Sequence, residues 1–243
     1  MLKPAEFVMA SSASPISAAH ADALEKDGFA RIPVLDPAST TIDVARRIGT
    51  VIDVGAHVRS FRVPSVQSLR PSSRAQAAAH SRYSARFGLD AFPLHTDLAH
   101  WSLPPRYLIL RCVVPAPAVR TLLLPSRDVV AALSAEVARR AVFRTRSRRR
   151  GRTGLRRALS GSTADWLFRW DPIFLRPVNT EAKRVAVRMI DTAWEQVARS
   201  IGMCASGDTI IVDNWTALHG RSSVPEGSEN RVVERAYLSE IIK

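Results

Sequence analysis

Short apolar or alternating runs recur along most of this chain, and runs of that length predict β-strands. They cover residues 29–35, 63–69, 91–100, 106–114, 120–124, 166–175, 209–212 and 231–241. A helical period of about 3.6 residues predicts helices instead over residues 17–27, 40–54, 126–142 and 179–201. Many short strands with a few flanking helices describe a mainly β chain, typical of a sandwich or jelly roll.

A hydrophobic fraction of 46% over 243 residues is enough for the packed core of one domain. We expect that domain to span residues 21–243, after a flexible arm over residues 1–20 that lacks the apolar run of a secretory signal. No apolar stretch approaches the length of about 20 residues that a membrane span needs. Cys112 and Cys204 lie in apolar segments and predict buried, reduced thiols in a cytoplasmic protein.

The net charge of +13 is concentrated in one segment, because residues 139–157 hold ten arginines and no acidic residue. We expect a basic lid or insert around residues 139–165. Such a segment could be a solvated lid, could steer an anionic substrate or an acidic carrier protein, or could bind nucleic acid phosphates. Phe143 is its only aromatic residue, and the lack of an aromatic ladder argues against nucleic acid.

Candidate chemistry begins at Phe92-Pro93-Leu94-His95-Thr96-Asp97. In an extended strand, His95 and Asp97 project from the same face and supply two thirds of a two-His-one-carboxylate site for Fe(II). Taken alone, the pair also fits a core histidine hydrogen-bonded to an acid. A distant histidine, His219, follows the apolar run 209–212, and Arg231 comes twelve residues later. That combination is much rarer than any one of its parts.

These motifs resemble the TauD/TfdA branch of the Fe(II)/2-oxoglutarate-dependent oxygenases, which includes the clavaminate-synthase-like enzymes. The matching runs are residues 83–88, 92–97, 207–214 and 219–221, and the arginines at 231 and 235. The resemblance implies a double-stranded β-helix with Fe(II) held by His95, Asp97 and His219. It also implies 2-oxoglutarate and O2 as co-substrates.

The resemblance further assigns Arg231 to the distal carboxylate of 2-oxoglutarate, for which a planar, two-pronged cation is suited. Thr121 occupies the position of a family threonine that contacts the same carboxylate. The glycines that usually precede that threonine are replaced here by the run 117–120. Four further residues are candidates for contacts with the substrate: Arg221, Arg235, His100 and Trp101.

Because Asp97 is present, whereas related halogenases lack the carboxylate, the resemblance implies hydroxylation or another oxidation of a C–H bond. The implied substrate is a small anionic or amino-acid-like metabolite, free or tethered to an acidic carrier protein. Two other classes stay open at this point. One is a nucleic-acid-binding module that uses the arginine-rich segment, with a vestigial metal site. The other is a hydrolase with Zn(II) on the same ligands.

Overall fold

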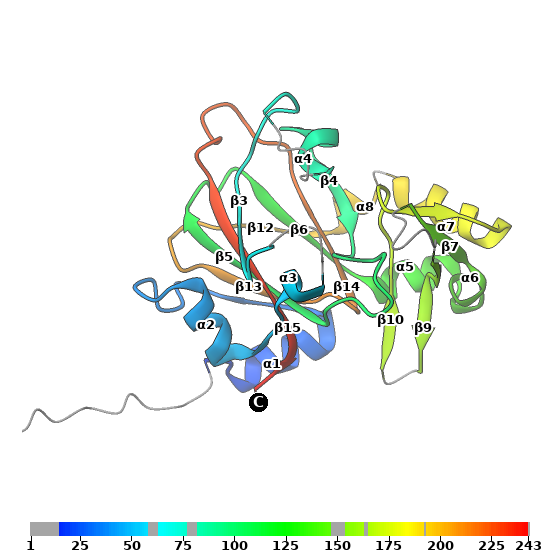
Figure 1. Cartoon of the computed structure of the whole chain (residues 1–243), viewed down its shortest axis with the longest axis horizontal. Coiled ribbons are helices and arrows are strands. Elements are labelled where there is room, and N and C mark those ends of the chain that lie inside the picture. The colour runs from blue at the N-terminus through cyan, green and yellow to red at the C-terminus, as the bar shows by residue number, and fades with distance from the viewer. Residues whose placement is uncertain are drawn as a thin grey trace, which may run out of the picture.

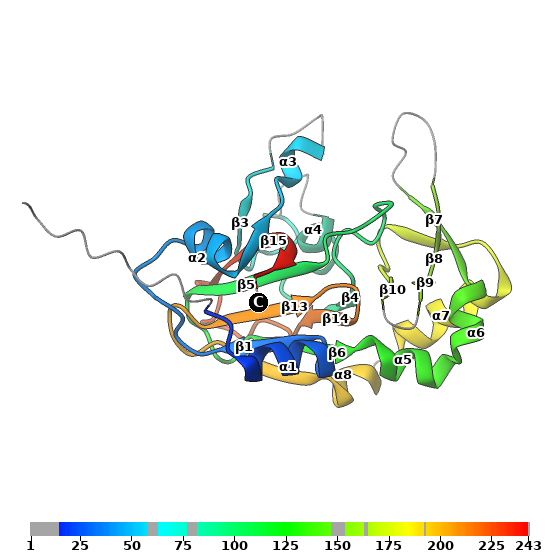
Figure 2. The same cartoon turned by 90° about the horizontal axis from the view of Figure 1, so that it is seen from below.

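The core of the computed structural model consists of two antiparallel sheets stacked face to face (Figures 1 and 2). The structure describes residues 15–57, 63–76, 82–146, 154–162, 165–191 and 193–242. The larger sheet has the order β1-β13-β5-β15-β2, with β3 also paired to β15, and the smaller sheet has the order β12-β6-β14-β4. A mainly β fold with flanking helices is thereby confirmed.

The strands of the larger sheet are β1 (Phe29–Ile32), β2 (Gly49–Val51), β3 (Val66–Leu69), β5 (Tyr107–Val114), β13 (Thr209–Asp213) and β15 (Val232–Ile241). Those of the smaller sheet are β4 (Phe92–His95), β6 (Arg120–Pro125), β12 (Arg199–Gly202) and β14 (Ala217–Arg221). Side chains from both sheets, including Leu108, Ile210 and Leu123, share one buried cluster between them. Functional side chains on these inner faces are therefore shielded from bulk water.

The outer face of the larger sheet is covered by α1 (Ala18–Asp27) and α2 (Thr41–Ile48), which pack against Ile109 and Ile211. The side chain of Ser17 caps α1 at its start, and Gly28 ends it in the left-handed conformation, with φ of 78°. Two short helices, α3 (Val54–His57) and α4 (Arg82–Phe87), lie in the connections before and after β3.

The outer face of the smaller sheet packs against a lobe seen on the right of Figure 1. Its helices are α5 (Ser126–Leu133), α6 (Ala135–Arg140), α7 (Thr180–Ile190) and α8 (Ala193–Val197). Its strands are β7 (Val142–Thr145), β8 (Leu155–Arg157), β9 (Leu159–Gly161), β10 (Trp166–Phe168) and β11 (Leu175–Pro177). The described parts of the predicted lid around residues 139–165 are thus mainly strands and the end of a helix, not a long loop.

Several predicted boundaries are wrong, two of them because strand pairing overrides helical periodicity. The helix expected over 40–54 ends at Ile48, since residues 49–51 pair with β15. The helix expected over 179–201 breaks at Asp191, and residues 199–202 pair with β6. The helix over 126–142 breaks at Ser134, whose φ is 72°. Of the strand expected over 166–175, only residues 166–168 and residue 175 lie in strands, in β10 and at the start of β11.

Two other expectations differ from the structure, one for the N-terminal arm and one for Cys204. Residues 1–14 of the expected arm lie outside the described residues, whereas residues 18–20 belong to α1. Cys112 is buried as predicted, but Cys204 is exposed because it lies in the loop after β12. Among the described residues, no helix is both long and apolar enough to cross a membrane.

Candidate active site

Two neighbouring strands of the smaller sheet, β4 and β14, bring His95 and His219 together. The register pairs the two residues directly, and paired residues of an antiparallel ladder project from the same face. Because Leu94 and Leu218 pack in the cluster on the outer face, both imidazoles point between the sheets. Their ring centroids lie 4.4 Å apart.

Asp97 completes the group from the turn that follows β4. Its Oδ1 lies 3.5 Å from His95 Nε2, and its Oδ2 lies 3.6 Å from His219 Nε2. All three residues are buried, and one ligand atom from each lies within 4.8 Å of the other two. The predicted convergence is confirmed, although Asp97 lies in a turn and not in the strand expected over 91–100.

The side chain of Asn214 fixes the backbone of Asp97. Its Oδ1 accepts a hydrogen bond from Asp97 N at 2.8 Å, and its Nδ2 donates to Asp97 O and to Pro105 O, both at 3.0 Å. Asn214 is fully buried, so these bonds face no competition from water. Asn214 thus holds the turn that carries the carboxylate.

Asp97 is held ionised by a cation and a hydroxyl from β15. Arg235 Nη1 donates to Asp97 Oδ2 at 2.7 Å, and the Tyr237 hydroxyl donates to the same oxygen at 3.0 Å. Gln67 accepts from Arg235 Nη2 at 2.6 Å and so anchors the guanidinium. Burial by itself raises the pKa of Asp97, but Arg235 and the two imidazoles outweigh it and hold the pKa well below its usual range.

The two histidines are arranged to ligate through Nε2. His95 Nδ1 lies 2.9 Å from Pro93 O, a contact that places the ring proton on Nδ1 and leaves the Nε2 lone pair free. Burial, together with the neighbouring His95, lowers the pKa of His219 and favours its neutral form, which is the form that binds metal. Two imidazole nitrogens and one carboxylate oxygen suit Fe(II) with coordination positions left open.

Gly220 allows β4 and β14 to approach closely enough for the two histidines to meet. A Cβ atom at this position would lie 2.7 Å from Phe92 O and 3.3 Å from Leu94 N, both in the backbone of β4. The ladder also shifts register between His219 and Arg221. A larger residue at 220 would therefore push the strand that carries His95 away from His219.

Arg231 and Thr121 meet between the sheets. Arg231 Nη2 lies 3.4 Å from Thr121 Oγ1, and both side chains are buried. Arg231 forms no ion pair within the described part of the chain. Burial lowers the pKa of Arg231. In the ladder of β6 and β14, His219 pairs with Leu123, and Thr121 lies two positions from Leu123 on the same face of β6. The Arg231 guanidinium therefore lies beside the triad. Since it has no acidic partner among the described residues, it suits a carboxylate ligand.

The other candidates for substrate contacts have structural partners. Arg221 stacks on Phe92 at 3.7 Å and donates to the carbonyl oxygens of Gly88 and Asp90. The Trp101 side chain packs in the cluster between the sheets. The His100 ring lies 4.7 Å from the ring of Phe174. Contacts of these residues with a substrate remain predictions, as does such a contact for Arg235.

Two residues beside the triad, Tyr83 and Asp171, had no predicted role in the site. The Tyr83 ring stacks on His95 at 4.3 Å. Its buried hydroxyl lies near Asp171 but has no hydrogen-bond partner in the described structure. Asp171 is 1% exposed; its Oδ1 accepts the N–H groups of Ile173 and Phe174, both at 2.7 Å. Burial raises its pKa to about 6. The only signal was one acidic residue within an apolar run.

The family model for the taurine catabolism dioxygenase TauD, TfdA family matches residues 4–193. The chain belongs to the TauD/TfdA family. The matched residues include His95 and Asp97, and the structure adds His219. With the triad intact, this TauD/TfdA protein is an Fe(II)/2-oxoglutarate-dependent oxygenase whose metal ligands are His95, Asp97 and His219. That assignment favours the oxygenase over the zinc hydrolase and the nucleic-acid-binding module.

Solved structures support the fold of this TauD/TfdA protein. An asparagine oxygenase, in complex with Fe(II), hydroxyasparagine and succinate, matches at a TM-score of 0.66 and 16% identity over 89% of this chain and 77% of that chain. The PvcB protein of Pseudomonas aeruginosa matches at 0.61 and 17% identity, over 90% and 78%. The non-heme iron oxygenase OrfP, with Fe, succinate and hydroxy-arginine, matches at 0.59 and 20% identity, over 88% and 75%. No curated protein matches the chain.

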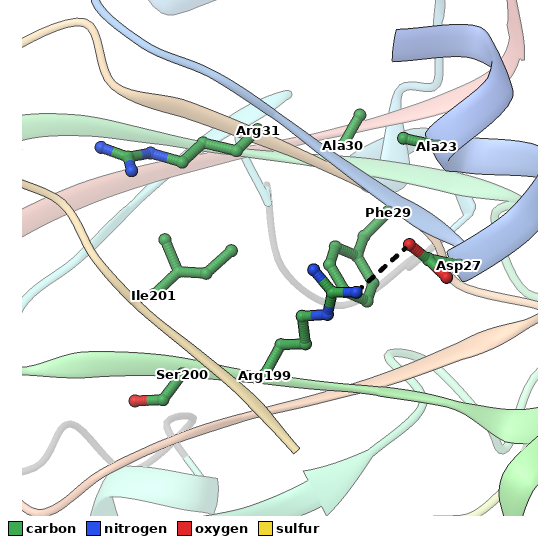
Figure 3. A pocket seen from close by; sticks show the side chains of 8 residues that line it. All are labelled: Ala23, Asp27, Phe29, Ala30, Arg31, Arg199, Ser200 and Ile201. Carbon is green, nitrogen blue, oxygen red and sulfur yellow. Dashed lines mark ion pairs between the residues drawn. The ribbon is translucent and has the colours of Figure 1, made fainter. Parts of the chain in front are cut away.

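A separate hollow of about 370 Å³ lies where the edge strands β1 and β12 of the two sheets approach each other (Figure 3). Figure 3 shows Arg199 reaching across Phe29 toward Asp27, and the two charged groups lie 3.8 Å apart. None of its lining residues belongs to the triad. The hollow is therefore distinct from the metal centre.

Proposed function

We propose that this protein hydroxylates an unactivated C–H bond of a small, amino-acid-like substrate, while 2-oxoglutarate is converted to succinate and CO2. Bound Fe(II), with 2-oxoglutarate and O2, supplies the oxidising power for that reaction. The convergence of His95, Asp97 and His219 in one buried site carries the proposal. The presence of the Asp97 carboxylate supports hydroxylation, because a halogenase needs that position for a halide.

Arg231 and Thr121 are our candidates for holding 2-oxoglutarate. A buried guanidinium without an acidic partner is costly unless a ligand supplies the negative charge. Arg231 is buried, and among the described residues its only side-chain partner is Thr121. The Arg231 Nε also has no hydrogen-bond partner in the described structure. A carboxylate that bound both edges of the guanidinium would satisfy these donors.

Asp171 is our candidate for recognising an amino group of the substrate. Its carboxylate is buried, uses two backbone N–H groups on Oδ1, and forms no ion pair with a described lysine or arginine. The ring of nearby Tyr83 stacks on His95, and its hydroxyl also has no hydrogen-bond partner in the described structure. A substrate ammonium group placed there would satisfy both groups and hold a neighbouring carbon near the metal.

Arg235 serves in this proposal as a positioning residue. It pairs with Asp97 and is anchored by Gln67, so it keeps the carboxylate ionised and oriented. The aromatic rings of Tyr83, Phe87 and Phe92 pack together beside His95 and help to keep water from the metal. The cytoplasm is the compartment we propose, since both cysteines are free.

An anaerobic titration with Fe(II) and 2-oxoglutarate tests the first part of the proposal. A weak visible charge-transfer band should form only when both are present. Aerobic screening of amino acids, each beside its analogue without the amino group, tests the second part through succinate release. We expect stimulation only by compounds that carry the amine. Absence of the band would overturn the oxygenase chemistry, and equal stimulation by the analogues would overturn only the role of Asp171.

A further inference from the structure

The small sheet of β7, β8 and β11 has two different faces. On one face, Phe143, Thr145 and Leu175 are buried against the lobe. On the other face, Arg144 lies directly opposite Arg176 in the ladder, and both are exposed. Because side chains alternate along a strand, these two arginines share the outward face.

This outward face carries positive charge without compensation. In addition to Arg144 and Arg176, it presents Arg146 and Arg157, and the three strands contain no acidic residue. None of these arginines forms an ion pair within the described residues. Like charges placed directly opposite each other destabilise a sheet, so the stability of the fold does not account for them.

Exposed apolar side chains lie among the arginines. Leu155, which pairs with Arg144, is 61% exposed, and Val178, whose N–H bonds to Val142 O, is 52% exposed. We call this surface the arginine face: Arg144, Arg146, Leu155, Arg157, Arg176 and Val178. A mixture of cations and exposed apolar groups is typical of a protein-docking surface and not of a solvated one.

The arginine face ends beside the proposed amine site. The N–H of Arg146 donates to Phe174 O at 2.8 Å, within the same turn that Asp171 caps. The pKa of Arg146 is lowered by burial and by the charges of Arg176 and of Arg86 on α4. The same sheet is tied to the loop after Asp97, because Arg156 Nε donates to Trp101 O at 3.0 Å.

We propose that the arginine face docks an acidic protein that presents the amino-acid substrate attached through its carboxyl group. This inference rests on the proposed function, since it needs the amine to meet Asp171. An amino acid attached in this way keeps its ammonium group and needs no cation for its carboxyl end. Arg235, which contacts the triad at Asp97, is already engaged by Asp97 and Gln67.

The exposed, outward spread of the arginines favours a macromolecule over a small anion, which would need convergent donors. The face carries no aromatic side chain on which bases could stack, and that favours an acidic protein over a nucleic acid. Since charge at such surfaces governs encounter and orientation, binding should be strongly salt-dependent.

Binding of two probes with similar charge tests the proposal: a fluorescent poly-L-glutamate peptide and an oligothymidylate. Affinities are measured on the intact iron-loaded protein at about 50 and 200 mM salt. The face variant is Arg144→Gln/Arg176→Gln. The matched control is Lys183→Gln/Arg184→Gln, which removes the same charge from an exposed part of α7.

We expect the face variant to bind poly-L-glutamate about tenfold more weakly than the wild type, whereas the control should lose less than about twofold. Equal losses in both variants would overturn the proposal, because net charge alone would then explain binding. Tighter binding of oligothymidylate that depends on the same two arginines would overturn it in favour of nucleic acid. The Fe(II)/2-oxoglutarate band should persist in both variants, which separates this test from that of the proposed function.

Discussion

Replacement of Asn214 by alanine should loosen the metal site without touching a metal ligand. The change deletes the acceptor for Asp97 N and the donor for two carbonyl oxygens, at distances of 2.8, 3.0 and 3.0 Å. A buried N–H left without a partner costs about 1–3 kcal/mol, and each lost bond to a carbonyl contributes about 0.5–1.5 kcal/mol. We therefore expect a loss of about 2–6 kcal/mol in the free energy of unfolding.

For a domain of this size, each kcal/mol shifts the melting temperature by about 2–4 °C, so thermal unfolding of Asn214→Ala should show a clear decrease. The more specific effect is on iron. Loss of a group that orients a metal ligand typically weakens metal binding by about 10- to 100-fold. Anaerobic Fe(II) titration of the folded variant, well below its melting temperature, measures that affinity directly.

Asn179→Ala is the matched control. Asn179 also makes three hydrogen bonds, to Val142 N, Ala182 N and Arg140 O at 3.1, 3.0 and 2.8 Å, but it caps α7 in the lobe. Its loss should cost about 1 kcal/mol of stability and leave iron affinity unchanged. If both variants lost iron equally, or if Asn214→Ala bound iron as the wild type does, Asn214 would not position Asp97.

Three further predictions concern other parts of the site. Arg231→Leu should raise the 2-oxoglutarate concentration for half-maximal turnover about 30-fold or more, since a lost buried charge pair costs about 2 kcal/mol or more; Fe(II) titration should show the metal retained. Gly220→Ala should weaken iron binding, because its Cβ would meet Phe92 O at 2.7 Å; unchanged affinity would contradict the close packing described. The pKa of Asp171 is raised to about 6 in the folded protein, above the value of about 4 in an unfolded chain. The free energy of unfolding is therefore highest at low pH and falls as the pH rises from about 4 through 6. Asp171→Asn should remove up to about 3 kcal/mol of that dependence in urea unfolding of metal-free protein, and should raise KM for an amine substrate at pH above about 6.

The sequence located the metal ligands because that information is local. In the β4 segment, Leu94 and His95 point to opposite faces whatever the rest of the chain does, and Leu94 packs outward in the structure. His219 follows an apolar run and precedes Gly220, whose small size the pairing with β4 requires. The mainly β class followed from the pattern, and the double-stranded β-helix followed from the family resemblance; the order of the strands was not predicted.

What could not be predicted depends on contacts between distant segments. Asn214 lies 117 positions from Asp97, and no local pattern shows that its amide holds that backbone. Asp171 was hidden in an apolar run, and its role depends on the burial that the fold imposes. Residues 199–202 continue a helical period, yet they pair with β6, because an open sheet edge gains more from a partner strand than from an added helical turn.

The pairing of Arg235 with Asp97 has a consequence for the order in which the co-substrates bind. The carboxylate is already neutralised by a guanidinium at 2.7 Å, so a divalent ion that enters alone raises the site to an excess of two positive charges. Of the two carboxylates of 2-oxoglutarate, one would pair with Arg231 and the other would offset part of that excess. Metal and co-substrate should consequently strengthen each other's retention, by equal factors in both directions, and a cell poor in either one would leave the protein largely empty of both.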